Sequence, residues 1–95
     1  MLREEIKAGM FISINIWTMH VFFRIIKVEA DKTGVRYLAE EIVPNEAKVK
    51  TTYLNNEVWS HDLANAKEID SKLFYKLKKT IDVYHTTINT ILNQQ

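Results

Sequence analysis

Apolar and polar residues alternate along the first half of the chain, which is the pattern of β-strands with one buried face. The first such segment is residues 10–16, and the second, residues 20–30, is rich in β-branched and aromatic side chains. The second segment contains two apolar series that would lie on opposite faces of a regular strand. The first is Val21, Phe23 and Ile25, and the second is Ile26 and Val28. We therefore expect a β-bulge near Ile25, which bends the strand sharply.

Turn residues separate the later strands. Residues 31–34, Asp-Lys-Thr-Gly, are typical of a tight hairpin because glycine adopts backbone angles that other residues avoid. Pro44 interrupts the pattern that follows, and Asn55 with Asn56 favours a further hairpin. The strands expected after residue 34 are residues 35–43, 49–54 and 57–59. Residues 60–63 have the pattern of a single helical turn, and residues 65–69 that of a short strand or a link.

A long amphipathic helix is the clearest element of the sequence. It is expected to begin at Asp70 or Ser71, either of which can cap its first amides, and to end near Leu92. Large apolar residues at spacings of three and four form one stripe along it, and they are Phe74, Leu77, Ile81, Tyr84, Ile88 and Ile91. Burial of each is worth about 2 kcal/mol, so the stripe needs a cover. The preceding strands are the preferred cover, and a second copy of the chain is the alternative.

These elements predict a single α+β domain over residues 1–95. We expect a small, strongly bent antiparallel β-barrel of about five strands over residues 9–69, with the amphipathic helix of residues 70–93 packed on it. The helix should also cover Phe11 and Phe22, which lie opposite the main apolar series. At about 33 Å the helix is longer than the rest of the domain is wide, about 28 Å, so about one turn should overhang.

By analogy of architecture alone, an SH3-like barrel fits the order of elements better than an OB-like barrel. The OB fold usually carries a helix between its third and fourth strands, where this chain offers only residues 44–48.

Composition narrows the class of protein further. Lys and Arg number 13 against 12 Asp and Glu, which argues against a protein that coats a polyanion. The chain has no cysteine, so disulfides and cysteine nucleophiles are excluded. Polar residues interrupt the apolar run at residues 10–23, so it is neither a signal sequence nor a membrane span, and a cytoplasmic protein is expected. Frequent Ile, Lys and Asn indicate AT-rich coding sequence, as in a low-GC bacterium, its phage or a mobile element.

The sequence offers little for catalysis. His61 beside Asp62, and His85 three residues after Asp82, read as surface pairs rather than as catalytic or metal sites. Glu40 and its neighbour at position 41 point to opposite faces of a strand, so they cannot flank one substrate bond. With two glycines in the chain, no phosphate-binding loop is expected. We predict a non-enzymatic protein with no cofactor, no metal and no small-molecule substrate.

Aromatic residues support the main functional hypothesis, which is a module that binds a protein partner or its own copy. The residues expected to line a groove between loops are Trp17, Tyr37, Tyr53 and Trp59.

The alternative hypothesis is an accessory protein that binds nucleic acid through the basic start of the helix. Residues 72–95 carry a net charge of +3, from Lys72, Lys76, Lys78 and Lys79 against Asp82. Arg24, Lys27 and Arg36 on the paired strands could extend this basic patch.

Overall fold

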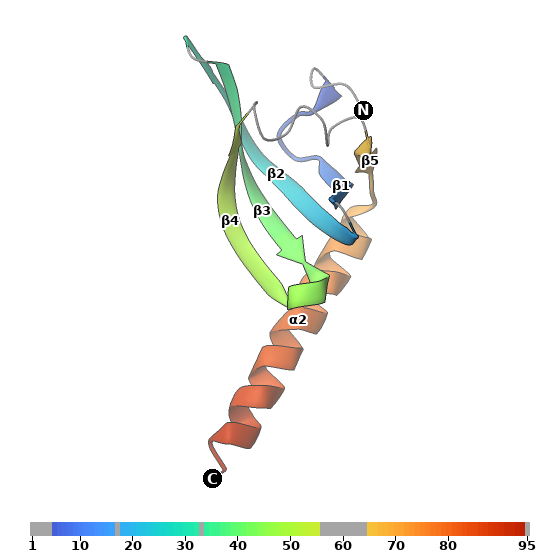
Figure 1. Ribbon diagram of the computed structural model, residues 1–95, viewed down its shortest axis with the longest axis vertical. Coiled ribbons are helices and arrows are strands. Elements are labelled where there is room, and N and C mark those ends of the chain that lie inside the picture. Colours follow the sequence, from blue (N-terminus) through green and yellow to red (C-terminus); the bar gives the residue numbers. More distant parts are fainter. Residues whose placement is uncertain (1–4, 17, 33, 56–64, 95) are drawn as a thin grey trace.

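The protein is a five-stranded antiparallel sheet followed by one long helix (Figure 1). The computed structural model describes residues 5–16, 18–32, 34–55 and 65–94. The sheet has the order β4-β3-β2-β1-β5. Its strands are β1 (Phe11–Ile16), β2 (Met19–Asp31), β3 (Gly34–Val43), β4 (Lys48–Asn55) and β5 (Lys67–Glu68), and the helix is α2 (Ser71–Leu92).

Local signals in the sequence fix the register of the central strands. The hairpin between β2 and β3 closes at the pair Asp31 and Gly34, and Gly34 has a positive φ of 129°. The register of these two strands shifts by one residue between Ile25 and Lys27. This confirms the expected bulge, but Val28 beyond it is 37% exposed, so the second apolar series does not point into the core as the first does. Pro44 ends β3 and starts the short 3-10 helix η2 (Pro44–Glu46).

The sheet is bent but open, so the expected closed barrel is wrong. β4 and β5 lie at opposite ends of the strand order, and no pairing within the described part of the chain joins them. β5 has two residues and pairs only with Ile12 and Ser13 of β1. The predicted strand 57–59 and the helical turn 60–63 lie outside the described residues. The α+β class is confirmed, whereas the SH3-like and OB-like assignments are not.

Apolar residues line both faces of the sheet, which explains why it does not close around a single interior. One face carries the larger core, formed by Ile6, Ile12, Ile14, Val21, Phe23, Ile25, Tyr37, Ala39, Val43 and Ala66. The other face carries a second core beneath the helix, formed by Ile42, Phe74 and Ile81 with the partly buried Phe11, Phe22, Ala47, Val49, Ile69 and Leu77. The expectation that the helix covers Phe11 and Phe22 is therefore confirmed.

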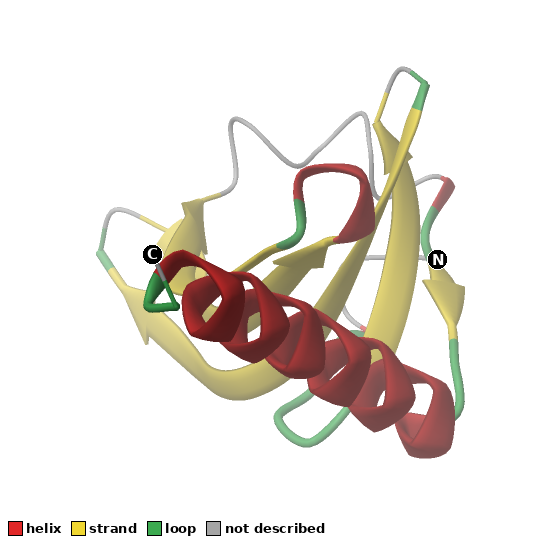
Figure 2. Ribbon diagram, turned by 90° about the horizontal axis from the view of Figure 1, so that it is seen from below, coloured by secondary structure: helices red, strands yellow, loops and turns green. Residues whose placement is uncertain are grey.

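Helix α2 crosses the second face from β1 towards β4 (Figure 2). Asp70 caps its start, since its carboxylate accepts a hydrogen bond of 2.8 Å from the amide of Lys72. The ring of Phe74 packs at a tilt of 58° against that of Phe11 on β1, with centroids 5.3 Å apart, and Ile81 packs in the same core as Val49 of β4. These contacts place the first half of the helix on the sheet.

The second half of α2 extends beyond the sheet, and the protein measures 53 × 24 × 23 Å as a result (Figure 1). Tyr84, Ile88 and Ile91 continue the apolar stripe but are 53%, 40% and 51% exposed. We expected the strands to cover the stripe except for about one turn, but they leave its last three members uncovered. Four strands spaced by about 4.8 Å are about 14 Å wide, which about ten helical residues cross. Counted from Phe74, which packs on β1, these residues end near Tyr84, so the overhang up to Leu92 is about two turns rather than one.

Docking of α2 predicts that a charge at Ile81 destabilises the domain. Ile81 is 7% exposed against the sheet, so Ile81→Asp should lower the free energy of unfolding by about 4 kcal/mol. The matched control is Val83→Asp, because Val83 is 55% exposed on the same helix and should lose less than about 1 kcal/mol. Urea unfolding followed by circular dichroism measures both. Equal losses in the two variants would contradict the docked arrangement.

Candidate interaction surface

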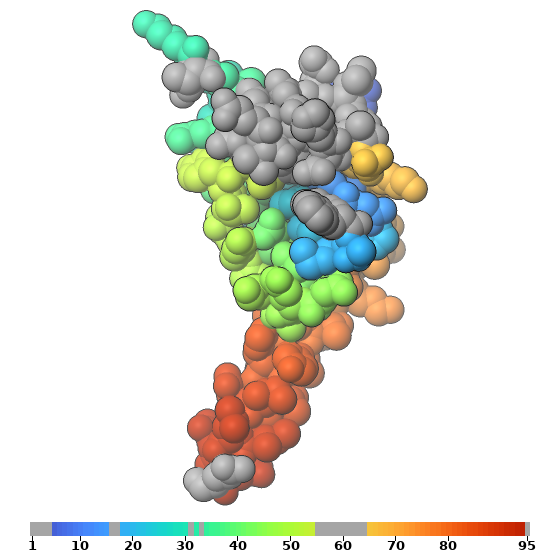
Figure 3. Space-filling view, viewed as in Figure 1, coloured from blue at the N-terminus to red at the C-terminus, as the bar shows by residue number. Residues whose placement is uncertain are grey.

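The exposed end of α2 carries an uncovered apolar surface. We call Tyr84, Ile88, Ile91 and Leu92 the apolar end of α2. Their side chains are 53%, 40%, 51% and 59% exposed, and helical geometry places them on one side of the helix, in line with the buried Phe74 and Ile81. Figure 3 shows this part of the helix projecting past the rest of the molecule.

The same segment is free of charge. Between Val83 and Gln95 the sequence has no Asp, Glu, Lys or Arg, and His85 is its one basic side chain. All four helix lysines and Asp82 precede it. The apolar end of α2 is therefore not flanked by the charged residues that normally keep a solvent-exposed helix apart from other proteins.

A buried carboxylate fixes the direction in which α2 leaves the sheet. Glu40 of β3 is 8% exposed and points towards the helix. Lys78 Nζ lies 2.7 Å from Glu40 Oε2, and Arg24 Nε of β2 lies 3.1 Å from Glu40 Oε1. Burial opposes ionisation of this carboxyl, but the hydrogen bonds from Lys78 and Arg24 outweigh it and hold the pKa of Glu40 below its ordinary value.

His85 holds α2 to the residue that joins η2 to β4. Its Nε2 donates a hydrogen bond of 2.6 Å to the carbonyl of Ala47, which lies 38 residues earlier in the sequence. Ala47 ends η2 with a positive φ of 50°, and this turns its carbonyl towards the helix. His85 is therefore a docking residue rather than the partner of Asp82 that its spacing predicted. No sequence signal indicated this contact, because its acceptor is a backbone atom.

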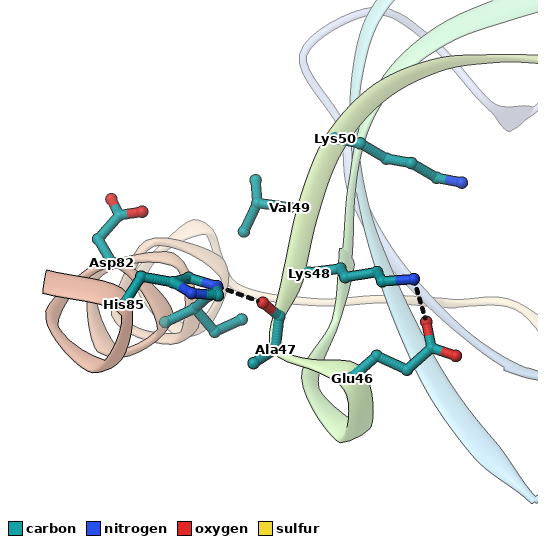
Figure 4. Close-up of a pocket in the computed structure, with 8 residues that line it drawn as sticks. Glu46, Ala47, Lys48, Val49, Lys50, Asp82 and His85 are labelled. Carbon is teal, nitrogen blue, oxygen red and sulfur yellow. Dashed lines mark hydrogen bonds and ion pairs between the residues drawn. The ribbon is translucent and has the colours of Figure 1, made fainter. Parts of the chain in front are cut away.

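An open groove lies beside this contact, between α2 and β4 (Figure 4). Its volume is about 400 Å³, and Val49, Ile81 and His85 contribute to its lining. Lys48 and Lys50 also border it, but their side chains extend away from the helix, and Lys48 is paired with Glu46 at 3.6 Å. The groove is therefore continuous with the point where the apolar stripe leaves the sheet.

Of the four aromatic residues predicted to line one groove, the structure describes Tyr37 and Tyr53, and these two lie on opposite faces of the sheet. Tyr37 is 2% exposed and belongs to the larger core, so the structure contradicts its place on a docking surface. Tyr53 is 51% exposed on β4, with the guanidinium of Arg36 4.5 Å from its ring centroid. Trp17 and Trp59 lie outside the described residues.

Most of the predicted nucleic-acid-binding cations are engaged in ion pairs. Arg24 and Lys78 share Glu40, as described above. Lys27 and Arg36 share Glu29, at 3.1 Å and 2.7 Å, and their hydrogen bonds lower the pKa of Glu29. The remaining three candidates are exposed on α2 and form no ion pair with a described residue, and they are Lys72, Lys76 and Lys79.

The described residues contain neither a metal-binding cluster nor a membrane-spanning helix. Within these ranges no three His, Asp or Glu side chains lie close enough together to hold a metal ion. No helix in the same part of the chain combines the length and apolar character needed to cross a membrane.

The Glu40 ion pairs predict a dependence of stability on pH. Because the pKa of Glu40 is lower in the folded state than its ordinary 4.5, its contribution is complete above pH 4.5 and is lost as the pH falls further. Glu40→Gln should cost about 2 kcal/mol at neutral pH, and the difference from the wild type should shrink below pH 4.5. Urea unfolding from neutral to acidic pH measures it. Glu68→Gln is the control, since Glu68 is exposed and unpaired among the described residues. A pH-independent difference would contradict this assignment.

Comparisons with protein-family models, with curated proteins and with solved structures found no match to this chain.

Proposed function

We propose that this protein is a non-enzymatic interaction module that binds a protein through the apolar end of α2. The observation that carries the proposal is the exposure of four large apolar side chains on one side of a helix, in a segment without charged residues. Contiguous exposed apolar surface of this kind marks interaction sites in soluble proteins.

The spacing of these residues supports recognition as a helix. Tyr84, Ile88 and Ile91 stand at positions i, i+4 and i+7, which are the anchor positions of a helix that lays its apolar side against a partner. Lys78 and His85 hold the preceding turns on the sheet, so these anchors are presented from a fixed base. Two solvent-exposed turns are marginal as a free helix, and a bound partner would stabilise them.

Three further parts of the proposal concern location, origin and likeness of fold. A cytoplasmic location is favoured by the polar residues that interrupt the first apolar run. An origin in a low-GC bacterium, its phage or a mobile element is favoured by the abundance of Ile, Lys and Asn. The likeness to SH3-like domains is limited to the order of hairpin-linked strands before a terminal helix.

A pair of matched variants tests the proposed surface. Ile88→Glu places a charge within the apolar end of α2, and Val83→Glu places the same charge on the other side of the helix, where Val83 is 55% exposed. We expect immobilised wild type and Val83→Glu to retain the same proteins. Ile88→Glu should bind these proteins with at least tenfold lower affinity, as measured by a binding isotherm. Both variants should keep the circular dichroism spectrum of the wild type. Retention that does not depend on Ile88 would contradict the proposal.

Binding of nucleic acid is the second candidate function, and only three exposed lysines favour it. Four of its seven predicted cations already neutralise Glu40 and Glu29, so few remain to release counterions from a phosphate backbone. We expect no saturable change in fluorescence polarisation with single- or double-stranded probes at about 50 mM salt. Binding that is abolished in the triple variant Lys72→Glu, Lys76→Glu, Lys79→Glu would instead favour this function.

A further inference from the structure

We propose that the protein bound by the apolar end of α2 is a second copy of this chain, paired antiparallel about a twofold axis near Ile88. This inference rests on the proposed function and specifies its partner. Three features of α2 support it, namely the register of its apolar residues, the absence of charge around them and the position of the sheet on the same stripe.

The register of the stripe is that of a two-stranded coiled coil. Its members from Phe74 to Ile91 follow strictly alternating steps of three and four residues, which are the a and d positions of a heptad. The positions that flank such a seam are the e and g positions, which usually carry the charges that select a partner of opposite charge. In the exposed half they are Thr87, His85 and Leu92. A surface without charge of either sign does not repel its own copy and offers nothing to attract a charged partner.

The sheet determines the relative direction of the two helices. Phe74 and Ile81 occupy the same stripe further towards the start of α2 and are buried against the sheet. In a parallel pair, the first half of the second helix would have to lie along this stretch, where the sheet already is. In an antiparallel pair, only the exposed halves overlap, and the two sheets lie at opposite ends of the pair.

In this arrangement the two apolar ends cover each other. Tyr84 of each copy lies beside Leu92 of the other, and the two Ile88 side chains meet at the axis, over an overlap of about 12 Å. The tip of each helix reaches the groove beside Ala47 and Val49 of the other copy, where the sheet stops covering the stripe. The helix of the second copy therefore continues the cover that the sheet begins.

The size of the contact predicts a weak dimer. Four large side chains that are each about half exposed can bury roughly 400 Å² of accessible surface per copy, or about 800 Å² in total. The smallest stable specific interfaces bury about 1,200 Å². We therefore expect a reversible dimer that forms between about 10 µM and 1 mM chain rather than a permanent one.

Sedimentation equilibrium over this range of concentration tests the pairing. We expect the wild type and Val83→Glu to pass from monomer to dimer as the concentration rises, and Ile88→Glu to stay monomeric with an unchanged circular dichroism spectrum. A wild type that stays monomeric would overturn self-pairing. The proposed function would still stand in that case, because the capture experiment measures binding of another protein through the same surface separately. A dimer that persists in Ile88→Glu would place the contact elsewhere and also overturn the inference. An Ile88→Glu variant that unfolds would overturn this inference and the proposed function together.

Disulfide trapping tests the direction of the helices, because the chain has no cysteine of its own. In the antiparallel pair, Tyr84→Cys should cross-link to Leu92→Cys when the two variants are mixed, while neither should cross-link to itself. Positions 84 and 92 are separated by about 12 Å along the helix, so a parallel pair would give the opposite result. Cross-linking of each variant to itself, without the mixed product, would overturn the antiparallel arrangement.

Discussion

The width of the sheet limits how much of helix α2 the chain can cover by itself. The helix crosses from Phe11 on β1 to Val49 on β4, a path of about three strand spacings that about ten helical residues complete. The helix has 22 residues and is therefore longer than the sheet is wide. Because the apolar stripe continues unchanged past that point, the fold leaves part of an apolar surface in solvent. The shape of the molecule and its candidate surface both follow from this mismatch in length.

Polar contacts set the angle at which the helix leaves the sheet. Apolar packing of Phe74 and Ile81 holds the helix on the sheet but is weakly directional. The Lys78–Glu40 pair and the hydrogen bond from His85 to Ala47 are directional, and they lie on the last turns before the overhang. Glu40 can stay ionised while nearly buried because two cations share its oxygens. The projecting turns therefore extend from a base whose direction is fixed by named contacts.

Charge is distributed so that the candidate interaction surface and the cations that hold the fold are separate. Glu40 and Glu29 each hold two basic side chains within the sheet or between sheet and helix. The segment after Asp82 has no charged residue. Part of the basic patch inferred from residues 72–79 is therefore already paired with acidic side chains of the fold. The apolar end of α2, in contrast, stays exposed. This contrast favours a protein partner over a nucleic acid.

Short-range patterns in the sequence determined the hairpin at Gly34, the bulge near Ile25, the start of the helix at Asp70 and the periodicity of its stripe. Each depends on residues close together in the chain, where backbone angles and side-chain spacing act directly. Tertiary structure alone decided that the sheet stays open, that Tyr37 is buried, that His85 binds a distant carbonyl and that the cover of the stripe ends after Ile81. These outcomes depend on how wide the sheet is and which of its faces the helix meets. Residue spacing along one strand or helix carries no information about distances between elements, so they could not be derived from the sequence pattern.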